Sequence, residues 1–468
     1  MTRVPGAGAP AHKLVVEYRS PNDLKPYPRN SRQHSVKQIR RIEESMRTFG
    51  FNCPVLIGDD DEIIAGHARV KAAQRLGLTL IPTIRMPKMS PVERRGFILA
   101  DNRIAEMATW DREVLAIELQ EIIDSGAFEV EVTGFTLAEI DVRLDEAKEK
   151  KEPAPGPEEA LPTLQKVAVT RRGDVWVLGL HRLICGDATS AADYEHLMIG
   201  KVAALVVADP PFNRPTRTFS GRGRTRHPDF VQGAGEMSED EFIAFLGSFL
   251  EQNMNVLADG SILFVCMDWQ HIGALITAGR QHDLTLKNLI VWVKTSAGMG
   301  SFYRGQHELV AVFKHGDAPH TNTFELGQHG RNRSNVWTYP GGGAFRVGRK
   351  NDLAMHPTVK PVAMIADAIR DVTRRSAIVL DPFAGSGSTI IAAERTGRIC
   401  YAIELDPRYC DVIVRRWQQY SGKLAQLEGS GTPFDDVEVE RSSQTPETLE
   451  SEKSAAPAAA TRTLRRAQ

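Results

Sequence analysis

The chain has 468 residues, which is too long for one ordinary hydrophobic core and enough for about two or three domains. Hydrophobic residues at 42% and charged residues at 25% are normal for a soluble globular protein, and a formal net charge of −1 excludes a chain that is basic throughout. Any nucleic-acid surface must therefore be a local concentration of Lys and Arg. The cysteines are scattered without a C-x-x-C pair, and no transmembrane-length apolar segment or secretory leader is found. We expect a cytoplasmic protein with no metal site and no membrane partner.

Changes in composition divide the chain. Residues 1–12 are rich in Gly, Ala and Pro, and residues 426–468 are largely polar, so both ends are expected to be disordered. Residues 146–162 mix a charge run with Pro and Gly, which is typical of a linker. The remaining segments, 13–145 and 163–425, each have the pattern of an α/β unit, and the first ends in a helical extension.

In the first unit, the spacing of Ile39, Ile42 and Met46 predicts a helix that ends at Gly50. Residues 54–78 then read as a strand, an acidic turn, a second strand and a helix that opens near Gly66.

In the second unit, residues 174–188 predict a β-hairpin, and strands alternate with helices from there on. Helices are expected around 238–257, 361–374 and 387–396, between short runs rich in Val, Ile and Leu. This alternation favours a doubly wound, Rossmann-like α/β sheet that binds its ligands at the carboxyl ends of the strands.

A glycine loop in residues 377–397 is the most informative ligand motif. A buried strand ends at Asp381, and Gly385 and Gly387 allow a sharp turn with close backbone approach to a ligand. No Lys precedes the Ser-Thr pair, which excludes a Walker A loop, and Ile390 stands where a dinucleotide fingerprint has its third glycine.

The strand that follows the loop ends on an acid, Glu404, whose carboxylate can accept both hydroxyls of a ribose. A nucleoside-containing cofactor without a pyrophosphate fits this arrangement, and S-adenosylmethionine is such a cofactor. The alternative is an ordinary glycine-rich turn beside a surface glutamate, which the correctly placed Asp381 and Glu404 disfavour.

A second motif, Asp-Pro-Pro-Phe, ends another predicted strand of the same sheet. Asp209 and a proline carbonyl can accept N–H bonds from an exocyclic amine, which localises the nitrogen lone pair towards a methyl donor. Phe212 can stack on a base that has left its duplex, and the prolines hold this corner rigid. The expected catalytic residues are Asp209, Pro210, Pro211 and Phe212. The alternative is a simple Pro-Pro turn that stops a strand.

The order of these motifs, "DPPF" before "DPFAGSGST", resembles the β-class DNA amino-methyltransferases over roughly 165–420, with supporting blocks "GDA", "IVWVK", "QHELVAVFKHG", "MHPTVKP" and "IELDP". An acid-first motif is typical of adenine-N6 enzymes in this family, whereas cytosine-N4 members usually begin with Ser. By this resemblance, Asp187 and Glu404 contact the adenosine part of the cofactor. The methionine part is surrounded by Asp381, Phe383, Ala384, Gly385, Ser386, Gly387, Ser388 and Thr389, and the pocket is closed by His356, Thr358 and Lys360.

Two basic loops flank the expected base pocket, at 214–227 and 331–350. Such loops are often no more than solvated surface, but together they favour contacts with double-stranded DNA. The resemblance to β-class enzymes implies a target-recognition segment between the "HELVAVF" and "HPTVKP" blocks, which makes 317–355 the candidate. The candidate DNA-binding residues are Arg214, Arg217, Arg222, Arg224, Arg331, Arg333 and Arg346.

The first unit resembles the ParB/sulfiredoxin-like fold, because "GHAR" matches its G-x-x-R nucleotide-binding turn. A glycine at a helix start with a cation one turn on can bind an anion, so Gly66, His67 and Arg69 form a candidate nucleotide site. The alternative is a common turn with a surface Arg69.

These observations predict a DNA methyltransferase that acts on adenine N6 and carries a ParB-like accessory unit. Cytosine-N4 methylation is the alternative within the same class. A ParB-like DNA- or nucleotide-binding regulator with an inactive methylase unit is the alternative from another class, and a dinucleotide oxidoreductase is disfavoured. A homodimer is compatible with the sequence, which does not give the oligomeric state.

Overall fold

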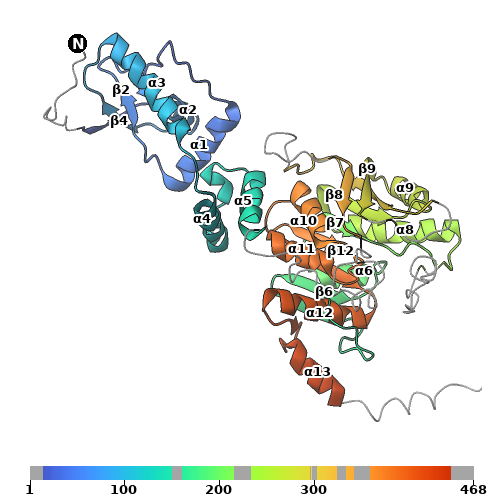
Figure 1. Ribbon diagram of the computed structural model, residues 1–468. Helices are drawn as coiled ribbons and strands as arrows, with labels where there is room; N and C mark the ends of the chain where they lie inside the picture. Colours follow the sequence, from blue (N-terminus) through green and yellow to red (C-terminus); the bar gives the residue numbers. More distant parts are fainter. Residues whose placement is uncertain are drawn as a thin grey trace, which may run out of the picture. The chain divides into compact units, whose positions relative to one another are not determined.

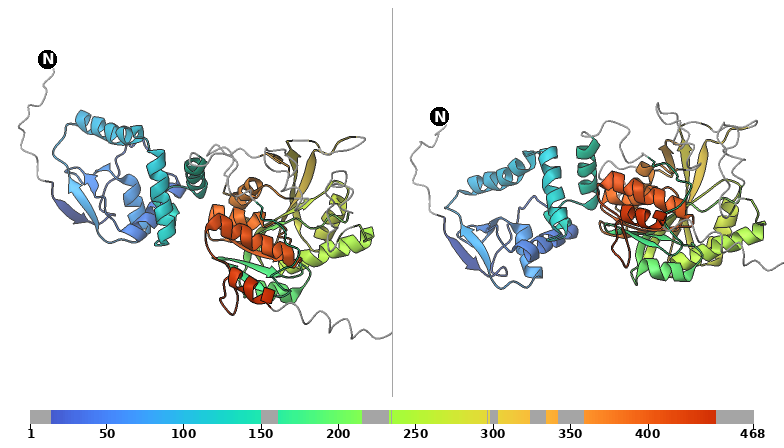
Figure 2. Two further views of the ribbon diagram at one scale, coloured as in Figure 1. Left: turned by 60° about the horizontal axis from the view of Figure 1, so that its bottom comes forward. Right: turned by 90° about the horizontal axis from the view of Figure 1, so that it is seen from below.

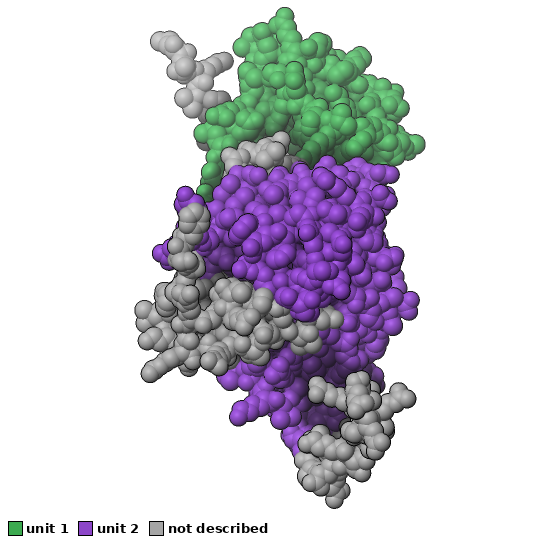
Figure 3. Space-filling model, turned by 90° about the vertical axis from the view of Figure 1, so that its right-hand side faces the viewer, with its two compact units in different colours: residues 1–151 green, residues 152–468 purple. Residues whose placement is uncertain are grey.

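The computed structural model describes residues 14–149, 161–214, 233, 235–295, 297, 303–323, 334–341 and 359–443. The chain divides into two compact units, residues 1–151 and 152–468, which Figure 3 shows in different colours. Within the described ranges, no helix is long and apolar enough to cross a membrane.

The first unit begins with a small α/β layer. Its sheet has four strands in the order β1-β4-β2-β3, in which β2 pairs parallel to β4 and the other pairs are antiparallel. Ser35 caps the first helix and Gly50 ends it with a φ of 81°, which confirms the helix end expected from the sequence. The elements are β1 (Val16–Arg19), α1 (Val36–Phe49), β2 (Val55–Ile57), β3 (Ile63–Ala65), α2 (His67–Arg75), β4 (Ile81–Arg85) and α3 (Pro91–Met107).

A helical extension with its own small core follows this layer. It comprises α4 (Arg112–Ser125), the 3-10 turn η1 (Val130–Thr133) and α5 (Leu137–Glu149). Leu115 and Leu119 of α4 pack with Val130, Ile140 and Leu144, so the helices bury one apolar face between them.

The second unit is built on a 10-stranded sheet in the order β11-β9-β10-β8-β7-β12-β13-β6-β5-β14. The strands β8, β7, β12, β13 and β6 run parallel, while β10 is antiparallel to its neighbours β8 and β9. The expected hairpin is present as the antiparallel pair β5 and β6.

The elements of this unit are β5 (Val175–Leu178), β6 (His181–Cys185), α6 (Ala191–Met198), β7 (Ala203–Ala208), α8 (Glu239–Met254), β8 (Leu257–Met267), α9 (Ile272–Gln281), β9 (Thr285–Lys294), β10 (His307–Lys314), β11 (Val336–Tyr339), α10 (Val362–Val372), β12 (Ile378–Asp381), α11 (Ser388–Thr396), β13 (Ile399–Glu404), α12 (Pro407–Ser421), β14 (Gln426–Leu427) and α13 (Phe434–Ser443).

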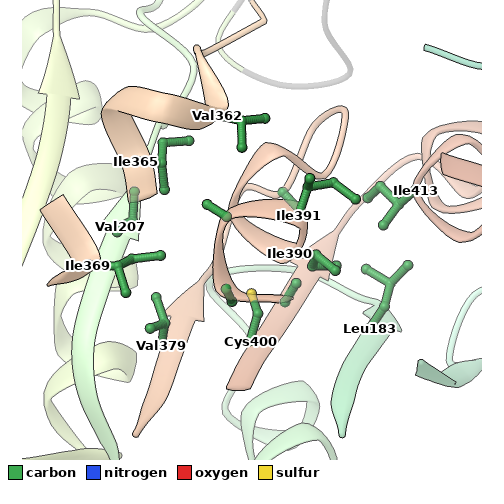
Figure 4. Close-up of a cluster of buried hydrophobic side chains, with 14 of the residues drawn as sticks. Leu183, Val207, Val362, Ile365, Ile369, Val379, Ile390, Ile391, Cys400 and Ile413 are labelled. Atoms are coloured by element: carbon green, nitrogen blue, oxygen red, sulfur yellow. The ribbon is translucent and has the colours of Figure 1, made fainter. Parts of the chain in front are cut away.

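Helices cover both faces of this sheet (Figures 1 and 2), which confirms the doubly wound α/β class. Successive strand residues point to opposite faces, so Val207 of β7 packs under α10 and α11, whereas Val206 packs towards α6 and α8. Figure 4 shows the first of these cores, formed by Leu183, Val207, Val362, Ile365, Ile369, Val379, Ile390, Ile391, Cys400 and Ile413.

Regular secondary structure in this unit continues past residue 425, where the sequence predicts a disordered tail. Residues 426–443 form β14 and α13 instead. Phe434 is fully buried with its ring centroid 5.0 Å from that of Trp176, and Arg441 donates to the Val169 carbonyl. The prediction failed because only a few apolar residues in this polar segment enter the core.

A buried hydrogen-bond chain ties the sheet to the helices on one face. The Nδ1 atom of His181 accepts from the Cys400 N–H at 2.9 Å, so its Nε2 atom carries the proton and donates to Glu394 at 2.6 Å. The bond from His181, which outweighs the opposing effect of burial, lowers the pKa of Glu394 to about 2. This carboxylate is therefore ionised throughout the ordinary pH range.

We predict that Glu394→Gln lowers the free energy of unfolding of the second unit by about 1–2 kcal/mol at pH 7. Because the folded pKa of Glu394 lies below its ordinary value, the wild-type advantage is present at neutral pH and is lost as the pH falls from about 5 towards 2. Denaturant unfolding at several pH values measures it. Glu251→Gln, on the exposed face of α8, serves as the matched control. An equal loss for Glu394→Gln at all pH values would contradict the linkage.

Candidate functional site

Acidic side chains gather at the carboxyl edge of the parallel strands. Cys185 of β6 pairs with Glu404 of β13, Ala402 of β13 pairs with Asp381 of β12, and Leu380 of β12 pairs with Val206 of β7. These registers bring the ends of the strands to one edge of the sheet. The carboxylates that follow or end them are Asp187, Glu404, Asp381 and Asp209.

The glycine loop between β12 and α11 adopts the tight turn that its sequence predicts. Gly385 and Gly387 have φ angles of 54° and 81°, a region that side chains disfavour. A Cβ atom added to Gly387 would lie 3.0 Å from Ile413. Asp381 accepts the Phe383 N–H at 3.0 Å and a bond from the Thr389 hydroxyl, so the loop is closed at its base. Burial raises the pKa of Asp381 to about 7 against these bonds.

Glu404 joins the glycine loop to the next strand. One of its oxygens accepts the Gly385 N–H at 2.8 Å and the other accepts the Asp406 N–H at 2.9 Å. Burial raises the pKa of Glu404 to about 7, although both N–H bonds favour the ionised form. Each carboxylate oxygen keeps a second lone pair, so an ionised Glu404 can still accept two hydroxyl groups of a ligand.

Contacts with residues outside the loop stabilise this turn. Arg416 is buried and donates to the Ser386 carbonyl at 2.9 Å and to the Ser388 hydroxyl at 3.2 Å. The Phe383 ring packs edge-on against Phe249 with 5.1 Å between centroids. Ala384 is buried and donates its N–H to Ile403 at 3.0 Å. Arg416 could not be predicted as a support of this loop, because nothing in a helical arginine shows which loop it reaches.

Asp187 lies at the end of β6, next to Glu404. Its Oδ1 atom accepts the backbone N–H and the hydroxyl of Thr189, at 2.9 and 2.7 Å. The preceding Gly186 donates its N–H to the Glu404 carbonyl at 3.0 Å. The structure thus brings Asp187, Glu404 and the glycine loop together, as their strand-end positions predict.

Asp209 follows β7 directly and binds Lys360, whose Nζ atom lies 2.6 Å from Oδ2. Its other oxygen, Oδ1, is buried and has no hydrogen-bond partner among the described residues. The Lys360 ammonium also lies 5.6 Å from the centroid of the half-buried Phe212 ring. Burial raises the pKa of Asp209, and the Lys360 charge opposes this rise. An acceptor without a partner, beside an aromatic ring, suits a planar group that carries N–H donors.

Asn213 anchors the end of the Asp-Pro-Pro-Phe corner. It has a φ of 51°, its Nδ2 atom donates to the Met237 carbonyl at 2.7 Å, and its Oδ1 accepts the Met237 N–H at 3.2 Å. Pro210 is buried. The role of Asn213 was not predicted, although asparagine after such a corner readily adopts the left-handed conformation.

Lys360 has a second carboxylate partner that the sequence analysis also missed. Glu308, at the start of β10, lies 3.2 Å from the Lys360 ammonium, and Lys294 at the end of β9 binds its other oxygen at 2.5 Å. Both lie within motif blocks, but only the antiparallel pairing of β9 with β10 brings them to this edge. The family resemblance implies a role for Lys360 in closing the cofactor pocket, whereas its contact with Asp209 is not predictable from the sequence.

Of the candidate DNA-binding residues, the structure describes Arg214. Arg214 forms an ion pair with Asp268 at 3.1 Å, and Asp268 also binds His271. Most of the predicted target-recognition segment and several site residues lie outside the described residues, namely Arg217, Arg222, Arg224, Arg331, Arg333, Arg346, His356 and Thr358.

The candidate nucleotide turn of the first unit lies at the start of α2. Gly66 has a φ of 107°, and His67 accepts the Tyr27 N–H at 3.2 Å. The guanidinium of Arg69 donates to the carbonyls of Cys53 and Pro54, at 2.6 and 3.0 Å. These contacts give Arg69 a structural role in the turn, while its binding of a nucleotide stays a prediction. In the part of the chain that is described, no His, Cys, Asp and Glu cluster could hold a metal ion.

Comparisons with known proteins find two families in different parts of the chain, and the second match extends from the first unit into the start of the second. Residues 203–415 match the N6/N4 methyltransferase family, described as DNA methylase, and residues 113–172 match the ParB-methyltransferase HTH domain. The chain is 39% identical over 85 residues to the ParB-like nuclease domain-containing protein YnaK of Escherichia coli (strain K12), covering 18% of this chain and 98% of that protein.

A second relative is the type II methyltransferase M2.MboI of Moraxella bovis, which is 22% identical over 233 residues, covering 47% of this chain and 82% of that protein. Among solved structures, that of the M1.HpyAVI–SAM complex is similar with a TM-score of 0.37 at 17% identity, covering 50% of this chain and 97% of that chain.

We predict that Arg416→Met destabilises the second unit by about 2–4 kcal/mol, because the Ser386 carbonyl and the Ser388 hydroxyl lose a buried donor. Hydrogen exchange at the amides of residues 384–388 should also accelerate. Arg408→Met on the same helix is the control, since its more exposed ion pair with Asp406 is worth less than about 1 kcal/mol. Equal effects of the two variants would show that Arg416 does not hold the loop.

Proposed function

Because the chain belongs to the N6/N4 family of DNA methylases and carries a ParB-like first unit, we propose that it methylates the exocyclic N6 of adenine in DNA. The family depends on S-adenosylmethionine. The observation that carries this proposal is the buried, unpartnered Oδ1 of Asp209, at the same sheet edge as the glycine loop. An acceptor in this position is what an amino group needs as it becomes a nucleophile.

The residues at this edge fit the cofactor. Glu404 and Asp187 offer carboxylate oxygens for hydroxyl groups, and the loop around Gly385 and Gly387 offers backbone without side chains. When bound, the cofactor supplies an electrophilic methyl group on a sulfonium. The side chains of Ser386, Ser388 and Thr389 are engaged in holding the loop, so its shape and backbone do the binding.

Asp209 orients the amino nitrogen and need not remove a proton before the methyl group arrives. The lone pair of an aromatic amine is delocalised into the ring, which makes the nitrogen a poor nucleophile. When Asp209 and a proline carbonyl accept its N–H bonds, the nitrogen moves towards tetrahedral geometry and its lone pair points away from both acceptors. After the nitrogen has gained the methyl group, it releases a proton to water.

An ionised Asp209 is the better acceptor, and Lys360 keeps it ionised. Burial raises the pKa of Asp209, and the ammonium 2.6 Å from Oδ2 opposes that rise without occupying Oδ1. Activity should therefore decline as the pH falls through the raised pKa of Asp209, because protonation replaces an acceptor by a donor.

The choice of adenine rests on the acid that begins the motif. Asp-Pro-Pro-Phe is typical of the adenine-N6 enzymes that this sequence resembles, and the ring of Phe212 can stack on an extruded base. Cytosine-N4 methylation is the second candidate, since the same acceptors suit any exocyclic amine. The presence of Asp209, Phe212 and the full glycine loop counts against an inactive methylase unit.

Double-stranded DNA is the proposed partner of the second unit. The base must leave the duplex to reach Asp209, because the amino group is otherwise paired. For the first unit we propose a DNA- or nucleotide-binding role, supported by its likeness to ParB-type proteins.

The central test uses mixed-sequence DNA and cofactor labelled in its methyl group, with digestion of the product to nucleosides. We expect labelled N6-methyladenine, reduced roughly a hundredfold to a thousandfold in Asp209→Ala because the lone pair is no longer oriented. Asp209→Asn, which keeps one acceptor oxygen, should retain more activity. The control is Asp240→Ala, at an exposed site on α8. Labelled N4-methylcytosine would overturn the assignment of the base, and full activity of Asp209→Ala would overturn the mechanism.

A binding experiment tests the role of Glu404. Glu404→Gln should weaken the binding of S-adenosylmethionine about tenfold or more in calorimetry, because an amide cannot accept through both of its terminal atoms. Since the pKa of Glu404 is about 7, wild-type affinity should also fall as the pH is lowered from 8 to 6. Glu195→Gln on the exposed face of α6 should bind normally. Unchanged affinity in Glu404→Gln would remove this residue from the site.

A further inference from the structure

The Lys360 ammonium contacts two carboxylates, Asp209 after β7 and Glu308 on β10. Its Nζ atom is 2.6 Å from Asp209 Oδ2 and 3.2 Å from Glu308 Oε2, and its side chain is only 8% exposed. Glu308 is in turn held by Lys294 at 2.5 Å. The charges therefore alternate along a chain from Lys294 through Glu308 and Lys360 to Asp209.

The pairing of β9 with β10 fixes the positions of Lys294 and Glu308. Lys294 ends β9 and Glu308 stands near the start of β10, where the antiparallel register sets Glu308 opposite Trp292. The Trp292 ring is buried and lies close to both lysines, with Nζ atoms 5.1 Å and 5.8 Å from the ring centroid. Two rigid strands and an aromatic ring thus define where the Glu308 carboxylate can be.

Burying a charge is costly unless an opposite charge compensates it. Asp209 alone would leave Lys360 with one partner, and the ammonium would be drawn fully to that carboxylate. With Glu308 as a second partner, the ammonium divides its attraction between two acids. Glu308 also favours the charged form of Lys360, whose ammonium then stays on Oδ2 of Asp209 and leaves Oδ1 able to accept a bond.

We propose that Glu308 is a positioning residue for methyl transfer, which acts by holding Lys360, with Lys294 as its anchor, so that Oδ1 of Asp209 stays free for the amino group. This inference rests on the proposed function. Glu308 does not touch the substrate. It acts on the nitrogen only through Lys360 and Asp209.

Glu308 and Lys294 have opposite effects on the titration of Asp209. Lys360, Glu308 and Lys294 face it, together with Asp381 of β12 and the Cys266 thiol of β8. The negative charge of Glu308 raises the pKa of Asp209, and the positive charge of Lys294 lowers it. Removal of each charge should therefore move the titration in a different direction.

The first experiment needs no methyl transfer. Full-length protein is treated with an N-hydroxysuccinimide ester, which modifies neutral amines, and the labelling rate of Lys360 is followed by mass spectrometry. Glu308 raises the pKa of Lys360. Glu308→Gln should therefore accelerate labelling of Lys360 severalfold. Glu438→Gln breaks a remote ion pair with Arg415 and should leave that rate unchanged. An unchanged Lys360 rate in Glu308→Gln would overturn the proposal.

The second experiment compares the pH dependence of kcat for these variants. Glu308→Gln should lower the plateau of kcat roughly tenfold to a hundredfold, with less than about a threefold change in KM for DNA. Its acidic limb should move to lower pH, whereas that of Lys294→Met should move to higher pH. A merely structural role would lower the melting temperature of both variants without moving the limbs in opposite directions.

Limbs that stay in place, or move the same way in both variants, would overturn the proposal. If the wild-type protein methylates no DNA, the proposed function fails instead, and the labelling of Lys360 still decides whether Glu308 holds that side chain.

Discussion

Acids gathered at one edge of a sheet repel one another, and the second unit depends on the way this repulsion is balanced. Asp381 ends β12 and Asp209 directly follows the neighbouring strand β7. Burial raises the pKa of both carboxyl groups, and the charge of Asp209 raises that of Asp381 further. Lys360 reaches this edge from the segment before α10 and places its ammonium on Asp209. Two backbone N–H groups donate hydrogen bonds to the Glu404 carboxylate and favour its ionised form. Each carboxylate is thereby held in one position, and Asp209 keeps one oxygen for a ligand.

The fold brings this edge together from segments that are distant in the sequence. Parallel strands supply the acids, the antiparallel β9 and β10 supply Lys294 and Glu308, and α12 supports the glycine loop through Arg416. The edge therefore combines a loop suited to a nucleoside with an acceptor suited to an amine. A DNA methylase requires these two parts side by side, because the methyl group passes directly between the groups they hold.

Much of this site could be predicted from the sequence, since short motifs end predictable strands. Asp209, Asp381 and Glu404 lie where an alternating α/β pattern places them. Contacts made by long side chains across the fold could not be predicted. These contacts depend on how the strands and helices are arranged. They are the ion pair of Lys360 with Asp209, the support of the glycine loop by Arg416, and the pairing of Lys294 with Glu308. The burial of Phe434 was hidden by its polar surroundings.

The most direct test is the structure of the protein with DNA and a non-reactive analogue of the cofactor. We expect the exocyclic amino nitrogen of an extruded adenine to lie within hydrogen-bond distance of Asp209 Oδ1, while Lys360 remains on Oδ2. We also expect the base to stack on Phe212. An amino group bound to Oδ2, with Lys360 displaced from Asp209, would contradict this mechanism, as would a base held away from this edge of the sheet.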